Sequence, residues 1–305
     1  MFNVPILFII FKRYDTTIKV FKEIQKIKPK KLYIAADAGR SSEEQIKCEE
    51  TRSIIKNIDW ECEIFTLFQK KNQGCKYGPY TAINWFFQHE EEGIILEDDC
   101  LPNNSFFQFM KEMINKYRDD DRIGMIAGHN PINIEIPYSY TFSRFKGCWG
   151  WATWKRAWNK IDIELQQIDY TKHIIPFMVY NKKREKHWKQ ALKLIEENKV
   201  AAWDWPWYFS LAAQNQLCIF PKKNLVANIG FGDDGTHCMG NAPENALTTY
   251  ELEFPLKSPS SITPYLEFEY TFEQGLNMGI INIRTIVGKI CPIPIKRIIK
   301  KILKS

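Results

Sequence analysis

The sequence contains no CxxC pair, although its 305 residues include eight cysteines. Zinc ribbons and disulfide frameworks use patterned cysteines, so neither is indicated, and a reducing cytoplasm is the compartment that fits best. Apolar runs long enough to span a bilayer are also missing. The short run 5–11 has no basic leader, and we therefore expect a buried strand there instead of a targeting segment.

Nucleic-acid recognition motifs are missing too, and most basic residues are scattered, so the net charge of +6 does not indicate a nucleic-acid partner. Much of the excess lies in residues 293–305. There, apolar residues occupy one face of an expected helix and basic residues the other. This pattern favours a peripheral contact with an anionic membrane surface at the inner face of the cell membrane. The alternative is a helix that docks its isoleucines on the domain.

Apolar and aromatic side chains are abundant: 45% of the residues are hydrophobic, 14% are aromatic and ten are tryptophan. A chain of this size can bury one large core, or a main domain with a modest appendage. Stacked indoles commonly hold the apolar faces of sugar rings, whereas most buried aromatic residues only fill a core. The composition is therefore compatible with a carbohydrate site without requiring one.

Strand-like and helix-like segments alternate through the first hundred residues. The expected strands are 4–11, 32–36, 61–67 and 93–96, and the expected helices are 15–27 with Asp15 as N-cap, 42–57 and 80–89. The alternation predicts a doubly wound α/β fold, and the wholly apolar strand 93–96 favours a mostly parallel sheet flanked by helices. We expect a main domain over 1–250, a wrapping extension over 251–292 and the basic tail.

Polar residues follow three of the expected strands: Lys12 and Arg13 after the first, Asp37 after the second, and residues 97–99 after the fourth. Ligands of open α/β sheets bind beyond the carboxyl ends of the strands, so these residues are candidates for one site. If the backbone stays extended through residues 97–99, Glu97 and Asp99 point to one side and Asp98 to the other.

Residues 97–99 are three adjacent carboxylates that repel one another, so they require a compensating positive charge. Mg²⁺ and Mn²⁺ prefer oxygen ligands, and such sites use one or two protein carboxylates together with water and phosphate oxygens. A cation held there would neutralise a departing diphosphate. The acidic triplet therefore predicts a divalent-metal site.

The same region belongs to a series of six segments whose order and spacing form a specific pattern: Asn72–Gly78, Trp85–Phe87, Gly93–Pro102, Gly147–Trp158, Trp203–Trp205 and Gly232–His237. The pattern resembles a bacterial branch of the GT-A nucleotide-diphospho-sugar glycosyltransferases. The triplet itself resembles the Glu-Asp-Asp form of the DXD motif in the N-acetylglucosaminyltransferase I type. The resemblance covers most of residues 1–240 and implies a GT-A fold.

By this resemblance, Asp99 binds the metal, Mn²⁺ or Mg²⁺, while Glu97 and Asp98 contact the ribose or the donor sugar. Asp37 hydrogen-bonds the base, expected to be uracil, and Arg13 lies against the nucleotide. A turn or helix-cap role is the alternative for Asp37. The implied donor is a UDP-sugar.

Three further residues are assigned to the donor phosphates. Lys76 is suited to balance phosphate charge, or else it is an ordinary surface lysine. Thr236 and His237 lie in a segment that resembles a loop closing over the diphosphate, with His237 near the phosphates or the metal. An exposed, inert histidine is the alternative.

Sugar transfer also needs a base, because an acceptor hydroxyl is a poor nucleophile until its proton is removed. Asp204 lies between Trp203 and Trp205, where partial burial would raise the basicity of its carboxylate and an indole could stack on a sugar. The resemblance implies that this aspartate is the base of an inverting displacement. Its alternative role is to cap the helix that begins near Pro206.

Trp149 and Trp151 lie in a glycine-punctuated aromatic stretch. We expect them, with Trp203 and Trp205, to shape a donor-sugar or acceptor pocket, and core packing is the alternative for each.

The sequence thus predicts an inverting, metal-dependent glycosyltransferase that acts on a glycan or glycolipid acceptor in the synthesis of bacterial surface polysaccharide or lipooligosaccharide. A sugar nucleotidyltransferase is one alternative, although no glycine-rich phosphate loop lies near the first strand. A non-enzymatic carbohydrate-binding protein is another, although it would have no use for the acidic triplet.

Overall fold

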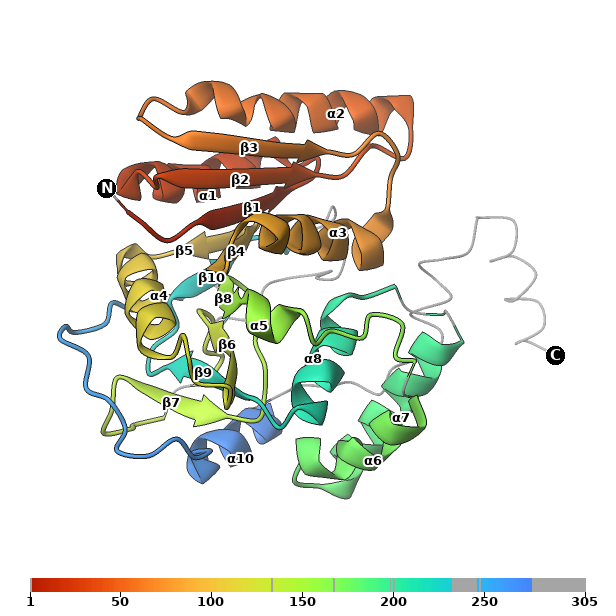
Figure 1. Cartoon of the computed structure of the whole chain (residues 1–305), viewed down its shortest axis with the longest axis vertical. Coiled ribbons are helices and arrows are strands. Elements are labelled where there is room, and N and C mark those ends of the chain that lie inside the picture. The colour runs from red at the N-terminus through yellow and green to blue at the C-terminus, as the bar shows by residue number, and fades with distance from the viewer. Residues whose placement is uncertain are drawn as a thin grey trace.

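The computed structural model describes residues 2–132, 134–166, 168–197, 199, 201–231, 246 and 248–275. These residues form a sheet with helices on both faces (Figure 1). The strands of the main sheet are β1 (Ile6–Ile10), β2 (Lys31–Ala36), β3 (Glu63–Phe68), β4 (Glu92–Glu97), β6 (Ile123–Ala127), β7 (Tyr140–Ser143), β8 (Trp151–Trp154) and β9 (Leu217–Pro221). The helices are α1 (Tyr14–Ile27), α2 (Ser42–Arg52), α3 (Gly74–His89), α4 (Asn104–Lys116), α5 (Lys155–Trp158), α6 (Ile168–Met178), α7 (Lys182–Glu196), α8 (Asp204–Ala213) and α10 (Leu266–Gly275).

The described strands are ordered β3-β2-β1-β4-β8-β6-β9-β7. Strands β3, β2, β1 and β4 are parallel, β8 is antiparallel to its neighbours β4 and β6, and β9 runs parallel to β6. Only β8 and β7 among these eight strands run against the common direction. The predicted fold class, a mostly parallel and Rossmann-like α/β sheet flanked by helices, is therefore confirmed.

Two apolar cores lie on the two faces of this sheet, because successive side chains of a strand point in opposite directions. Ile6, Phe8 and Ile10 of β1 pack with helices α1 and α4, whereas Leu7 packs on the other face with α3, α8 and α10. All four of these strand residues are at most 1% exposed. Burial of both faces explains why β1 and β4 are nearly continuous apolar runs.

A smaller third core joins the antiparallel pair α6 and α7 to α8. Ile175 of α6, Leu192 of α7 and Phe209 of α8 are almost fully buried in it. Trp188 of α7 packs edge-on against Trp205 of α8, with ring centroids 6.2 Å apart. This packing fixes α8, which forms one wall of the cleft described below.

A short two-stranded ribbon, β5 (Cys100–Pro102) with β10 (Val226–Asn228), lies beside the main sheet. It returns the chain to the end of β4, where the Ile229 N–H donates to the Asp99 carbonyl at 2.8 Å. Residues 248–265 then run along the molecule, with backbone contacts to the Asn224 and Phe142 segments, before α10 begins. No helix within the described ranges is long and apolar enough to cross a bilayer.

Three predicted element boundaries are wrong. The N-cap of α1 is Arg13 and not Asp15, which lies in the first turn. Helix α3 begins at Gly74, six residues before the expected start, because the Asp37 carboxylate accepts hydrogen bonds from the backbone N–H groups of Gln73 and Gly74. The expected helix 42–57 ends at Arg52 and continues as a 3₁₀ turn over Ser53–Asn57. The predicted domain limits stay a prediction, and the tail 293–305 lies outside the described residues.

Candidate active site

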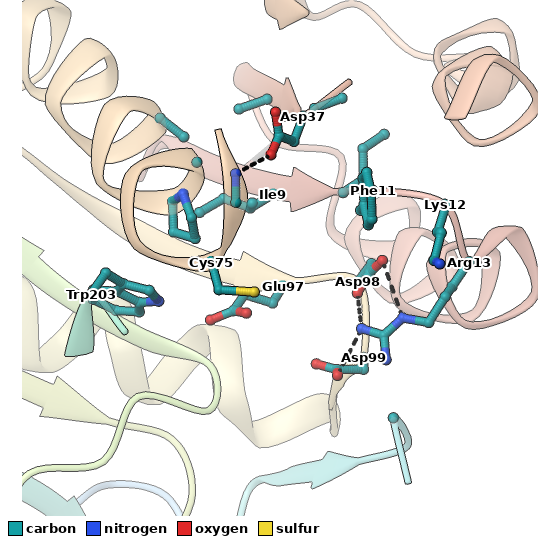
Figure 2. Close-up of a pocket in the computed structure, with 18 of the residues that line it drawn as sticks. Ile9, Phe11, Lys12, Arg13, Asp37, Cys75, Glu97, Asp98, Asp99 and Trp203 are labelled. Atoms are coloured by element: carbon teal, nitrogen blue, oxygen red, sulfur yellow. Dashed lines mark hydrogen bonds and ion pairs between the residues drawn. The ribbon is translucent and has the colours of Figure 1, made fainter. Parts of the chain in front are cut away.

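A cleft of about 450 Å³ opens at the carboxyl ends of β1 and β4. Strand order reverses at this point, because β2 and β3 extend the sheet on one side of β1 and β4 lies on the other. The cleft receives side chains from several parts of the chain that lie far apart in sequence (Figure 2). Its polar and aromatic lining includes Arg13, Asp37, Arg40, Glu97, Asp98, Asp99, Trp149, Trp203, Asp204 and Trp205.

Arg13, directly after β1, binds two of the three acidic residues after β4. Its Nη2 donates to Asp99 Oδ2 at 2.8 Å and also forms an ion pair with Asp98. Glu97 lies apart from this group, toward Cys75 and Trp203 (Figure 2). The expected alternation of the three carboxylates is therefore wrong: β4 ends at Glu97 and the chain turns at the next two residues, so Asp98 and Asp99 reach the same guanidinium.

The acidic cluster carries more negative charge than Arg13 can neutralise. Burial raises the pKa of Glu97 to about 8, and the neighbouring carboxylates of Asp99, Asp98 and Asp204 add to this effect. Burial also raises the pKa of Asp98 to about 6, against the opposing effect of Arg13. Both shifts mean that a further positive charge in the cleft would be favourable.

The oxygen atoms at the cleft wall suit a divalent cation only if a ligand completes its coordination. Among the described residues, no group of three or more His, Cys, Asp or Glu side chains is arranged to hold a metal. Mg²⁺ and Mn²⁺ sites that share the ion with a diphosphate need only one or two carboxylates, and Asp99 supplies one at the cleft wall. Its Oδ1 contacts only the Cys100 thiol, at 3.5 Å, in the hydrogen bonds of the described chain. The carboxylate chemistry thus fits a cation shared with a phosphate ligand.

Asp204 lies on the opposite wall, in the first turn of α8. Burial raises the pKa of its carboxyl to about 6, and hydrogen bonds from the backbone N–H groups of residues 204 and 205 oppose the shift. An aspartate with this pKa is largely ionised at neutral pH and is a stronger base than an exposed one. The helix begins at Asp204 itself, with Trp203 at the N-cap.

Three of the four predicted tryptophans line the cleft. These are Trp149, Trp203 and Trp205. Trp151 does not: it is 0% exposed and stacks on Trp203, with ring centroids 5.6 Å apart, inside the core beneath the cleft. Core packing is therefore its role, because β8 is a central strand that helices cover.

Asp37 and Lys76 are engaged by other protein groups. Both oxygens of the Asp37 carboxylate accept backbone N–H groups, from Ala38, Gln73 and Gly74, at 2.9–3.0 Å. Asp37 thus holds the start of α3, and the loop that leads into it, at the cleft wall. Lys76 points away from the cleft lining and pairs with Glu164 at 2.8 Å. Predicted residues Thr236 and His237 lie outside the described residues.

Sequence reasoning missed Arg40, Cys75 and Gly230, which also line the cleft. Arg40 follows β2 and carries no motif of its own. Cys75 belongs to the segment Asn72–Gly78, but no role in the site was expected for it, and the start of α3 places it at the cleft. Gly230 packs against the acidic cluster: a Cβ on it would collide with the Asp99 carboxylate and lie 2.7 Å from Arg13 Nη1.

We expect Gly230→Ala to weaken nucleotide-diphosphate binding by about tenfold or more, because displacing site groups by about 1 Å is costly. Isothermal titration with UDP measures the effect. Gly147→Ala is the control, since its Cβ would meet its nearest neighbour at 3.2 Å outside the cleft lining. Equal affinities of the two variants would contradict the contact between Gly230 and the site.

The fold and the cleft together define a class: a doubly wound α/β protein with a cleft at its topological switch point, where ligands of such sheets bind. No known family model matches the chain, and no curated protein matches its sequence. Among solved structures, it is similar to Staphylococcus aureus TarS (residues 1–349), at 10% identity and a TM-score of 0.41, over 74% of this chain and 60% of that chain. The chain thus spans less than two thirds of the TarS structure.

Two further solved structures are similar to this chain. One is an apo UDP-glucose pyrophosphorylase, with 11% identity, a TM-score of 0.36, and coverage of 73% of this chain and 93% of that one. The other is the glycosyltransferase GlyE of Streptococcus pneumoniae TIGR4, with 10% identity, a TM-score of 0.33, and coverage of 63% and 44%. Likeness at this level leaves function to be argued from the cleft itself.

Proposed function

We propose that this chain is an inverting glycosyltransferase of the GT-A type that moves a sugar from a nucleotide-diphosphate donor, expected to be a UDP-sugar, to a glycan or glycolipid acceptor. One observation supports this most: a single cleft brings Arg13 and the acidic triplet together with Asp204 and three tryptophans. Phosphate recognition, a base and a sugar-stacking surface are the three elements that such a reaction needs.

In this proposal the diphosphate lies at the carboxyl ends of β1 and β4, where Arg13 offers its guanidinium and Asp99 a carboxylate. A bound Mn²⁺ or Mg²⁺ would supply positive charge for the leaving diphosphate. Glu97 and Asp98 face the ribose or the donor sugar. The metal-binding role of Asp99 follows the carboxylate chemistry, and the loop with Thr236 and His237 is proposed to close over the phosphates.

The acceptor hydroxyl approaches from the α8 wall. Asp204 removes its proton as the bond to the anomeric carbon forms and the bond to the diphosphate breaks, so configuration inverts and no covalent intermediate is needed. Trp203 and Trp205 flank the carboxylate, and their rings offer surfaces for the apolar faces of acceptor sugars. Trp149 is proposed to face the donor sugar.

A nucleotidyltransferase would also use an acidic metal site on such a sheet, but it would have no use for a base between two tryptophans. Incubating the full chain with a panel of nucleotide-sugars, Mn²⁺ and candidate acceptors separates the two. Release of nucleoside diphosphate and a glycosylated acceptor supports transfer. Formation of a nucleotide-sugar from a sugar phosphate and a nucleoside triphosphate would favour the alternative.

The pH dependence of the reaction follows from Asp204, since only its ionised form accepts a proton. With a pKa of about 6, kcat/KM is expected to fall about tenfold per pH unit below that value and to level off above it. Rates from about pH 5 to 8 at constant ionic strength check this. A profile that stays flat across this range would contradict Asp204 as the base.

The setting proposed for this reaction is the inner face of the cell membrane, in bacterial surface polysaccharide or lipooligosaccharide synthesis. The support is the amphipathic, basic pattern of residues 293–305, whose cationic face suits anionic lipid.

A further inference from the structure

The turn between α6 and α7 presents an apolar side chain beside a row of lysines. We call residues 177–186 the α6–α7 corner. Phe177 is 73% exposed at the end of α6. Lys182, Lys183 and Lys186 are exposed on the first turns of α7, and none of them forms an ion pair with a residue that the structure describes. An exposed phenylalanine next to unpaired cations is typical of a surface that meets lipid headgroups.

The corner is held rigidly by α10. Glu273 of α10 accepts hydrogen bonds from the Tyr180 N–H at 2.8 Å and from Asn181 Nδ2 at 2.7 Å, and its carbonyl accepts one from Arg184 at 2.6 Å. Glu269, one turn earlier, is fully buried and engaged by Arg144. These two α10 carboxylates are therefore engaged by Tyr180, Asn181 and Arg144 and are unavailable to the lysines of the corner.

The whole of α7 is cationic. It contains six Lys or Arg residues against two Glu, a net charge of +4. Its two acidic residues bind cations of the same hairpin, since Glu185 pairs with Lys189, and Glu196 with Lys172. Tyr270 of α10 is 47% exposed and packs on Tyr180 of the corner with ring centroids 4.5 Å apart. Aromatic and basic side chains thus occur together at this end of the molecule.

The corner is also linked to the cleft wall. Trp188 of α7 packs on Trp205 of the cleft wall. From the exposed Phe177 and the charge complementarity of α7 with anionic headgroups, we propose that the α6–α7 corner is a contact site for an anionic lipid surface. This proposal extends the proposed function and rests on it for the membrane setting.

Co-sedimentation of the full chain with phosphatidylglycerol-containing vesicles, compared with pure phosphatidylcholine vesicles, tests the corner. We expect the triple variant K182E/K183E/K186E to bind the anionic vesicles at least about tenfold more weakly than wild type, and the difference to shrink in high salt. The matched control K19E/K22E/K30E has the same charge change at exposed positions on and beside α1, distant from α7 (Figure 1), and should bind nearly as wild type does.

The apolar part of the contact has its own pair of variants. Phe177→Ser should weaken vesicle binding several-fold, whereas Ile46→Ser, at a site that is 70% exposed on α2, should not. Thermal unfolding curves that match wild type show that each variant is folded.

A tail variant in which Lys296, Arg297, Lys300 and Lys301 become glutamine separates the two contacts. If this change removes all vesicle binding while both corner variants bind as wild type does, the proposal is overturned. Binding to soluble dextran sulfate without binding to vesicles also overturns it. Because vesicle binding requires no turnover, a chain that binds lipid but transfers no sugar would refute the proposed function alone.

Discussion

Replacing Asp204 by asparagine is expected to abolish sugar transfer while nucleotide affinity stays nearly unchanged. The amide has almost the same shape as the carboxylate, so the α8 wall with Trp203 and Trp205 should remain in place. It cannot accept a proton, and loss of a positioned base typically costs about 10²- to 10⁴-fold in rate. Measuring kcat with a labelled donor, and UDP affinity by calorimetry in the same buffer, gives both quantities.

The control tests whether neutralising a different buried carboxylate also abolishes sugar transfer. Glu90 is 9% exposed and hydrogen-bonds Tyr33 and Lys31, away from the cleft lining. Glu90→Gln should therefore change stability but leave kcat within a few-fold of wild type. If Asp204→Asn transfers sugar as fast as Glu90→Gln does, Asp204 is not the base.

The strand framework of the site could be predicted from local sequence. The apolar runs that became β1, β2 and β4 are buried on both faces, so their composition alone distinguishes them from the amphipathic segments between them. The acidic triplet could be placed at the cleft because it directly follows one of these runs. Burial of that run between two helical layers is a property that hydrophobic pattern encodes well.

Contacts between distant segments could not be predicted in this way. Trp151 and Trp149 are two residues apart, and only the insertion of β8 between β4 and β6 decides that Trp151 fills the core while Trp149 lines the cleft. Lys76 turns toward Glu164, 88 residues away, instead of the cleft. Asp37 binds the start of α3 across 36 residues. In each case the local pattern gave the residue type, and tertiary pairing gave the role.

Replacing Asp99 by alanine should weaken both donor binding and turnover, in contrast to Asp204→Asn. If Asp99 holds the cation that the diphosphate shares, the variant loses the metal-dependent part of UDP affinity, expected to be about tenfold or more. Calorimetry with UDP in Mn²⁺ and in EDTA measures this part directly. Wild type should bind UDP more tightly in Mn²⁺ than in EDTA, and Asp99→Ala should bind it equally in both.

The comparison in EDTA also separates the effect of the metal on UDP affinity from the effect of Arg13. In Asp99→Ala, Arg13 loses one of its two carboxylate partners. A guanidinium freed from Asp99 would attract the diphosphate more strongly, and that gain would be present with or without the cation. Loss of the cation acts in the opposite direction and only in Mn²⁺. The effects of EDTA and of Asp99→Ala on UDP affinity should therefore be non-additive, as expected when both changes remove the same interaction. A variant that retains the full Mn²⁺-dependent gain would place the metal elsewhere.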